Sequence, residues 1–350
     1  MREPPIFDGH NDVLTRLLNA GGRSAVETFV SGRNGHLDVP KAQKGGFGGG
    51  FFAIWVPSPS DGGVRYQEMN RPKYDLPLPG PLSPSEALEV VMAEAALLFQ
   101  LEELGALQVC TTSREIKSCL ETGKMAAVFH IEGAEAIDRE FHTLDVLYQA
   151  GLRSLGPVWS RPTIFAEGVP FKFPSTPDIG AGLTPDGFRL VEKCNALGIM
   201  LDLSHLNEAG FWDVAKHSDH PLVATHSNVH AICPHARNLT DEQLKAIAES
   251  DGMVGLNFAA AFLRDDGRMN SDVPLDQLLR HLDHLIAIVG ENRVGFGSDF
   301  DGAVVPDDIS DVSGLPNLRE AMRRHGYTEA LLAKLCCGNW LRVLEKTWGA

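Results

Sequence analysis

Eight short apolar runs recur along this chain, and most of them end in or beside a polar residue. They read PPIFDGH (4–10), GGGFFAIWV (48–56), MAAVFHIEG (125–133), LRSLGPVW (152–159), IMLDLSH (199–205), PLVATHS (221–227), GMVGLNF (252–258) and RVGFGSDF (293–300). Runs of this length and composition are typical of buried strands. Helical stretches separate most of them, and strands that alternate with helices predict a parallel sheet. Eight such units favour an α/β fold of the closed (β/α)8, TIM-like barrel type over an open sheet.

Five segments between or after these runs carry helix signals. From Ser85 to Leu104, apolar residues recur every three or four positions. Thr184–Leu197 opens with Thr-Pro-Asp, a cap followed by proline in the first turn, and Thr240–Glu249 opens with the pattern of a capping box. Leu275–Val289 and Thr328–Lys346 complete the set. The helices supply the long connections that parallel strands need.

Length, charge and cysteine usage restrict the class of protein. We expect one domain over residues 1–350, because single α/β barrels reach this length. The net charge of −15 disfavours nucleic acid and anionic membrane surfaces as partners. The six cysteines form no Cys-x-x-Cys pair, and the N-terminus lacks the apolar core of a secretory signal. These features predict a cytoplasmic protein with reduced thiols.

Two long segments show no clear periodicity. Residues 57–84 hold seven prolines, and residues 160–183 are rich in Pro, Gly and Thr. Long loops inside a compact domain usually serve as lids or binding loops. We interpret both segments in this way.

Residue types that bind metals stand at the ends of several runs. They are His10 and Asp12 after the first run, Glu132 at the third, His205 at the fifth, His226 at the sixth and Asp299 at the eighth. The carboxyl ends of the strands meet at one face of a parallel barrel, where active sites lie. Taken alone, His-x-Asp is more often a capped turn that opens a helix. Six such groups converging would repel one another and lose solvation, and a metal centre resolves that cost.

The number of candidate ligands indicates two metal ions. A single catalytic zinc takes three protein ligands and a water, whereas five ligands and a further aspartate fit two ions that share one carboxylate. Paired metals about 3.5–4 Å apart hold a bridging hydroxide and polarise the bond to be cleaved. The pattern therefore predicts metal-assisted hydrolysis.

The motifs also resemble those of a known family. DGHND, HIEG, LDLSH, THSNVHAICPHARNLTDEQL and GFGSDFDG follow one another as in the renal (membrane) dipeptidase family, the M19 metallopeptidases of the amidohydrolase superfamily. The likeness runs from residue 6 to about residue 346, and His-x-Asp on the first strand distinguishes this family from most amidohydrolases. It implies an amidohydrolase-type barrel that cleaves dipeptides, with a bridging hydroxide attacking a metal-polarised carbonyl. It also implies homodimers and acceptance of a D-residue at the C-terminal position.

Residue roles follow from the resemblance. It implies two zinc ions per chain, with His10 and Asp12 on the first ion, His205 and His226 on the second, and Glu132 as the bridge. Asp299 would take a proton from the bridging water and pass it to the leaving amine. Arg237, eleven residues after His226, matches an arginine that grips the terminal carboxylate of the substrate. A planar guanidinium suits that anion better than a lysine would.

One position departs from the family pattern. Where animal members carry a histidine that contacts the substrate carbonyl, the stretch LRSLGPVWSRPT places Trp159. An indole N–H can only donate a hydrogen bond. We expect Trp159 to bind substrate, either through that single donor or as a wall of the pocket.

Several alternatives remain open from the sequence. Asp301 could take the role given to Asp299, and Asp299 could instead cap a helix. Arg237 by itself reads as a solvated loop residue, while His130 and Asp202 could either support ligands or have purely structural roles. For the function, the alternatives are an amidohydrolase acting on a cyclic amide, lactone or N-acyl amino acid, and a metal-binding protein without catalysis.

Overall fold

Eight parallel strands form a nearly closed α/β barrel in the computed structural model, which describes residues 3–58 and 66–349. They are β1 (Ile6–Asn11), β2 (Phe47–Trp55), β5 (Ala126–Glu132), β6 (Leu152–Gly156), β8 (Met200–Leu201), β9 (Val223–Ala224), β10 (Met253–Leu256) and β11 (Val294–Phe296). Neighbours in the barrel follow one another in the chain, and β1 pairs with β11. Each strand overlaps one of the eight apolar runs, so the (β/α)8 prediction is confirmed.

The barrel closes between its two shortest strands, β8 and β9. A single parallel bridge joins Asp202 to Val223, and the N–H of Leu203 donates to the carbonyl of Val223 at 2.8 Å. β8 ends at Leu201, before His205, and β9 ends at Ala224, before His226. The chain that carries His205 and His226 is therefore irregular rather than extended.

Glycine allows β2 to lie close to both of its neighbours. A Cβ on Gly49 would lie 2.0 Å from the carbonyl oxygen of Ala126, and one on Gly50 would lie 2.5 Å from that of Asp8. A side chain at either position would push the strands apart. The glycines of this strand thus reflect close backbone approach.

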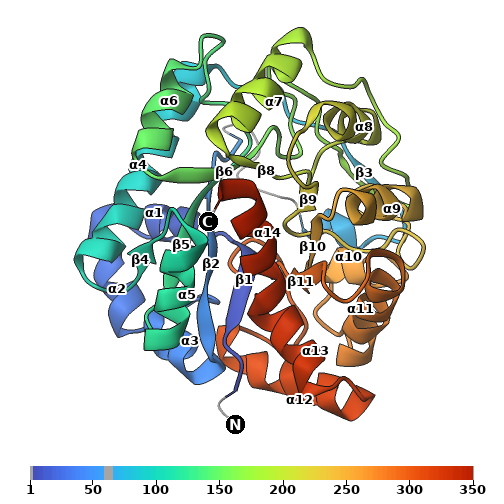
Figure 1. Ribbon diagram of the computed structural model, residues 1–350. Helices are drawn as coiled ribbons and strands as arrows, with labels where there is room; N and C mark the ends of the chain where they lie inside the picture. The colour runs from blue at the N-terminus through green and yellow to red at the C-terminus, as the bar shows by residue number, and fades with distance from the viewer. Residues whose placement is uncertain (1–2, 59–65, 350) are drawn as a thin grey trace.

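Helices surround the strands (Figure 1). They are α1 (Val13–Asn19), α2 (Val26–Ser31), α3 (Val39–Gly45), α4 (Pro84–Glu103), α5 (Ser113–Thr122), α6 (His142–Gln149), α7 (Pro185–Leu197), α8 (Glu208–His217), α9 (Asp241–Glu249), α10 (Ala260–Leu263), α11 (Leu275–Val289), α12 (Leu315–His325), α13 (Glu329–Ala333) and α14 (Asn339–Trp348). Thr184 caps α7, and Thr240 and Gln243 form the predicted capping box of α9. The helix predicted over 328–346 is divided by a π-helical turn at Lys334–Gly338. Within the described residues, no helix combines the length and apolarity needed to cross a bilayer.

Helix α14 covers the amino ends of the strands. Trp340 is fully buried, and its Nε1 donates to the carbonyl of Phe296 at 3.0 Å. It shares a core cluster with Met200, Val223 and Met253, each the first residue of its strand. Figure 1 shows α14, in red, across the centre of the barrel. This end is closed, so the opposite, carboxyl end of the strands is left for a site.

The two aperiodic segments are joined by a small sheet that the sequence analysis missed. β3 (Tyr74–Leu76) and β7 (Phe171–Phe173) pair in antiparallel fashion, with Tyr74 opposite Phe173. The hydroxyl of Tyr74 donates to the carbonyl of Gly267 at 2.6 Å. Three-residue strands are too short to show alternation. Part of the first predicted loop, residues 59–65, lies outside the described residues.

Candidate active site

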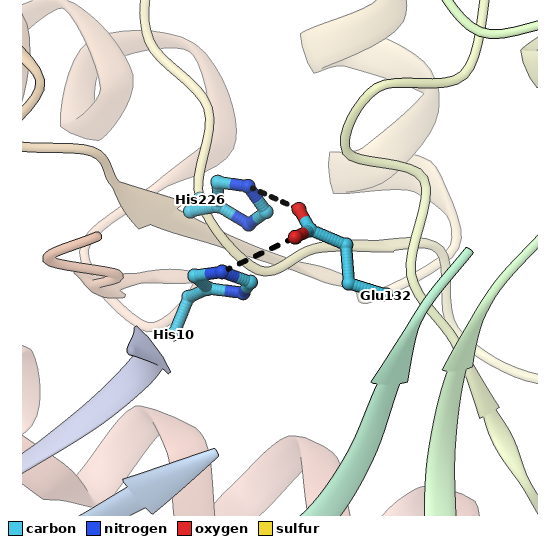
Figure 2. Close-up of side chains that lie close together, drawn as sticks. All are labelled: His10, Glu132 and His226. Carbon is cyan, nitrogen blue, oxygen red and sulfur yellow. Dashed lines mark ion pairs between the residues drawn. The ribbon is translucent and has the colours of Figure 1, made fainter. Parts of the chain in front are cut away.

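The carboxyl ends of the strands bring the five predicted metal ligands together. Oε1 of Glu132 lies 3.0 Å from Nε2 of His205 and 3.3 Å from Nε2 of His226. Its Oε2 lies 3.7 Å from Nε2 of His10, which in turn lies 3.3 Å from Oδ2 of Asp12. Figure 2 shows Glu132 pointing at both His10 and His226. The Glu132 carboxylate thus lies between two groups of donors, the position that a bridging ligand requires.

Asp12 is not used as a helix cap. Helix α1 begins at Val13, and the side chain of Asp12 makes no capping hydrogen bond. The side chain of Asn11 instead donates to the carbonyl of Phe51 at 2.9 Å and lies 3.5 Å from the N–H of Val13. The carboxylate of Asp12 is therefore left facing His10, which argues against the capped-turn alternative.

The electrostatics of the cluster favour bound cations. Burial lowers the pKa of His205 and of His226 well below the usual value, so both rings are neutral, the form that binds metals. Burial also acts to lower the pKa of His10, but the carboxylates of Glu132 and Asp12 outweigh it and raise the pKa to about 10. The two carboxylates stabilise a positive charge at this point, and a divalent ion would provide that charge.

Two of the histidines are oriented by hydroxyl groups. The hydroxyl of Thr225 donates to Oδ2 of Asp202 at 2.6 Å, so it accepts from Nδ1 of His226 at 2.8 Å. Nδ1 of His205 lies 2.9 Å from the hydroxyl of Ser160. With both Nδ1 atoms occupied, both Nε2 atoms are directed at the cluster, 3.2 Å apart. Such support is typical of metal-binding histidines, and the donor set of imidazoles and carboxylates fits two zinc-like ions.

His130 lies behind the cluster. Its Nδ1 is 2.9 Å from the hydroxyl of Ser154, and its Nε2 is 3.7 Å from Oδ2 of Asp202. Its ring meets that of His10 edge-on at 5.8 Å between centroids. Burial lowers the pKa of His130 to about 4, so it is neutral and supports its neighbours by packing.

The structure distinguishes the two aspartates after β11. The carboxylate of Asp301 is fully engaged: it accepts from Nη1 of Arg33 at 2.8 Å and from the N–H groups of His36 and Leu37 at 2.9 and 3.3 Å. A carboxylate tied in this way has a structural role. The geometry therefore disfavours Asp301 as the proton carrier.

Asp299 lies at the cluster and does not cap a helix. A carboxylate oxygen of Asp299 lies within 4.8 Å of ligand atoms of both His10 and Asp12. Its Oδ2 accepts from Nδ2 of Asn257 at 3.0 Å. Burial, and next the charge of Asp12, raise the pKa of Asp299 to about 6. Sequence reasoning missed Asn257, although it lies next to the end of the seventh apolar run, because an amide is not a typical metal ligand.

A cavity of about 420 Å³ opens at this end of the barrel. One part of its lining is aromatic, formed by Trp55, Trp159, Phe171 and Phe262. The other part is polar and includes Asp12, Thr15, Arg16, Asn19, Tyr66, Asp299 and Asp301. A cavity of this size with convergent polar groups is typical of a small-molecule site.

Trp159 forms part of the aromatic wall. Its ring centroid lies 5.1 Å from that of Trp55 and 5.7 Å from that of Phe171. The guanidinium of Arg161 lies 5.4 Å from the same ring. These contacts place the ring of Trp159 in the wall of the cavity. Its indole N–H has no hydrogen-bond partner among the described residues, so the donor alternative stays open.

Arg237 is buried beside the cluster. Its Nη2 donates to the carbonyl of His226 at 3.1 Å, and its guanidinium lies 5.4 Å from the ring of Phe262, through which it meets the cavity lining. Its backbone N–H donates to Nδ1 of the buried His235. Burial lowers the pKa of Arg237 to about 10, so the side chain remains charged at neutral pH. The solvated-loop alternative is therefore wrong.

Comparisons with known proteins identify the family of this chain. The model of the membrane dipeptidase family, peptidase family M19, matches residues 1–348. A metallo peptidase from Rhodobacter sphaeroides, solved with a phosphinate mimic of the dipeptide L-Ala-D-Ala, is 53% identical, with a TM-score of 0.97 over 99% of this chain and 100% of that one. The M19 metallo peptidase called dipeptidase AC gives the same identity and TM-score, over the whole of both chains. An uncharacterized protein encoded in the pqqA 5′ region of Klebsiella pneumoniae is 48% identical over 267 residues, 76% of this chain and 98% of that protein.

The barrel, with buried histidines and carboxylates gathered at its carboxyl end, is typical of a metal-dependent hydrolase. Within that class, the chain belongs to the membrane dipeptidase family, peptidase family M19. The protein is thus a metallo-dipeptidase.

Proposed function

We propose that this protein cleaves dipeptides with two zinc ions and that the terminal carboxylate of the substrate binds Arg237. The proposed zinc ligands are His10, Asp12, Glu132, His205 and His226. Asp299 is the proposed proton carrier, and Trp159 is proposed to form the wall against which the substrate packs.

The observation that carries this proposal is the unpaired charge of Arg237. The residue is 3% exposed, and its Nε has no hydrogen-bond partner among the residues that the structure describes. Burial lowers the pKa of Arg237, and the charges of Glu132 and Asp299 only partly offset that shift; neither carboxylate forms an ion pair with it. A buried and unpaired cation is costly, and the free carboxylate of a dipeptide offsets that cost on binding. A lactone or cyclic amide offers no such group.

The chain's own residues suit peptide hydrolysis. Two divalent ions held by the five ligands would polarise the scissile carbonyl and lower the pKa of a water molecule. Asp299, with a pKa near neutrality, is suited to take up a proton and return it to the leaving amine. Because Asn257 donates to Oδ2, Oδ1 of Asp299 is the oxygen left to carry that proton. The same hydrogen bond keeps the carboxylate from rotating.

A D-residue at the C-terminal position is part of the proposal. The Rhodobacter sphaeroides protein, at 53% identity, binds a mimic of L-Ala-D-Ala. This likeness supports acceptance of either configuration beside Arg237. A screen of L-Ala-L-Ala against L-Ala-D-Ala on the zinc-loaded enzyme tests it.

The test of the carboxylate site uses the variant Arg237→Met and a pair of substrates. Truncating one partner of a sheltered charge pair costs about 2–5 kcal/mol, so kcat/KM for a free dipeptide should fall by about thirtyfold or more. The loss should be far smaller for the same dipeptide with an amidated C-terminus, since that substrate never offered the charge. Arg237→Lys keeps the charge without the planar guanidinium, so its kcat/KM for the free dipeptide should lie between those of the wild type and Arg237→Met. Equal losses on both substrates, in a variant that keeps its metal content, would refute the proposed role and favour the cyclic amide or lactone alternative.

A further inference from the structure

Arg16 is a second arginine at the cavity, and the activity described above does not use it. It lies on α1, one helical turn after Asp12, and its backbone N–H donates to the carbonyl of Asp12 at 3.3 Å. Together with Thr15 and Asn19 it forms part of the polar lining. Arg237, by contrast, meets the lining at the aromatic ring of Phe262. The two arginines therefore approach the substrate space from different walls.

One hydrogen bond holds the guanidinium of Arg16 in place and, within the described part of the chain, leaves its two terminal nitrogens free. Its Nε donates to the backbone carbonyl of Asp301 at 2.6 Å, which holds the side chain along the wall. Its two terminal nitrogens, Nη1 and Nη2, have no hydrogen bond or ion pair with residues 3–58 or 66–349. The side chain is exposed at the cavity. Two donors thus remain free on a side chain whose direction is already set.

Among the residues that the structure describes, no neighbouring charge is paired with Arg16. The carboxylate of Asp301 is taken by Arg33 at 2.8 Å, and that of Asp12 faces His10. The other arginine close to the aromatic wall, Arg161, is paired with Glu135 at 2.9 Å. In a chain of net charge −15, Arg16 therefore stands out as a free cation at the cavity. A planar, fixed guanidinium with two free nitrogens is suited to a carboxylate.

The position of Arg16 indicates which part of the substrate it meets. With the terminal carboxylate at Arg237 and the scissile amide at the metal cluster, the N-terminal residue extends beyond the cluster. Arg16 lies one helical turn after Asp12 and also lines the cavity. Asn19 adds an amide three residues further along the same helix face. A carboxylate carried by the N-terminal side chain would reach these groups.

We infer that Arg16 determines substrate preference and that dipeptides with an acidic N-terminal residue, Asp-X and Glu-X, are a favoured substrate class. This inference rests on the proposed dipeptidase function and names the substrates of that same site.

The test compares substrates that differ in charge but hardly in size. The wild-type, zinc-loaded enzyme is assayed on L-Asp-L-Ala against L-Asn-L-Ala and on L-Glu-L-Ala against L-Gln-L-Ala. Hydrogen bonds to charged groups support a preference of about tenfold in kcat/KM for the acidic member of each pair. Arg16→Met should bring the ratio close to one, and Arg16→Lys should keep part of it. Arg114→Met, an exposed arginine on α5 away from the cavity, is the matched control and should keep the full ratio.

The possible outcomes distinguish failure of this inference from failure of the proposed dipeptidase function. Loss of the acidic preference in Arg16→Met, with metal content and melting temperature retained, supports the inference. Brisk dipeptide hydrolysis without an acidic preference in the wild type, or a preference that survives Arg16→Met, overturns it and leaves the dipeptidase proposal intact. If Arg16→Met instead loses discrimination between free and amidated C-termini, Arg16 holds the terminal carboxylate and the inference is wrong. Absence of any dipeptide hydrolysis would overturn both proposals.

Discussion

At the scale of single residues, the site combines predictable side chains with an unusual backbone. His205, Asp299 and Asp301 have φ values of 68°, 61° and 66°, in a region that non-glycine residues rarely adopt. Hydrogen bonds hold these conformations: the N–H of Asp299 donates to the carbonyl of His10 at 3.0 Å, and the carbonyl of His205 accepts from Val169 at 2.8 Å. Backbone strain of this kind is often found where function fixes a side chain.

Replacing the proposed proton carrier tests its role directly. Asp299→Asn keeps the size of the side chain but removes the group that titrates, so kcat should fall by about 10²–10⁴, the usual contribution of general acid–base catalysis. Steady-state kinetics and metal analysis of the same preparation give the answer. Near-wild-type kcat with full metal content would show that Asp299 does not carry the proton.

The residue types at the strand ends could be predicted from sequence, but their supporting contacts could not. His10, Glu132 and His226 each lie at or next to the end of a recognisable apolar run, and the carboxyl ends of parallel barrel strands meet at one face. Asn257 and Arg16 are polar residues of ordinary kinds whose roles depend on contacts made across the barrel. A single sequence carries no signal for such contacts.

At the scale of elements, helix α4 carries a buried acid that should make stability depend on pH. Glu94 is fully buried, and its Oε2 accepts from the N–H of Trp55 at 3.0 Å. Burial raises the pKa of Glu94 from 4.5 to about 8. The folded protein therefore keeps a proton on Glu94 that the unfolded chain releases above pH 4.5. The contribution of protonated Glu94 to the free energy of unfolding is fully present below pH 4.5 and is lost as the pH rises through 8.

The variant Glu94→Gln removes this dependence. It should melt close to wild type at pH 5 but at a higher temperature than wild type at pH 9. One pKa unit corresponds to about 1.4 kcal/mol, so the gain at pH 9 should amount to a few kcal/mol at most. Thermal unfolding followed by circular dichroism measures it, with the exposed Glu89→Gln on the same helix as control. A gain of equal size at both pH values would contradict the assigned protonation.

Elements with strong local signals were predicted, and those fixed by tertiary contacts were not. The capping box of Thr240 and the bounds of Leu275–Val289 agree with the structure, because caps and periodicity act locally. The sheet of β3 and β7 joins segments far apart in the chain, and the π turn at Lys334–Gly338 continues a helix without a local stop signal. The sheet and the π turn depend on tertiary packing, and hydrophobic periodicity in the sequence carries no information about such packing.

At the scale of the whole molecule, the two ends of the barrel differ in the side chains that they carry. The amino end is filled by Trp340 and the apolar residues around it, while the carboxyl end carries the charged cluster. The alternation of strands and helices predicted this architecture. The single bridge that closes β8 to β9 could not be predicted, because it depends on strands only two residues long.

We propose that five side chains hold two zinc ions that share Glu132. The most direct measurement is the number of zinc ions per chain, determined by mass spectrometry of the elements after reconstitution with zinc and removal of free metal. We predict two ions per chain, with activity lost on chelation and restored by zinc. A value that stays at one after reconstitution would contradict the bridging role of Glu132 and with it the two-metal centre.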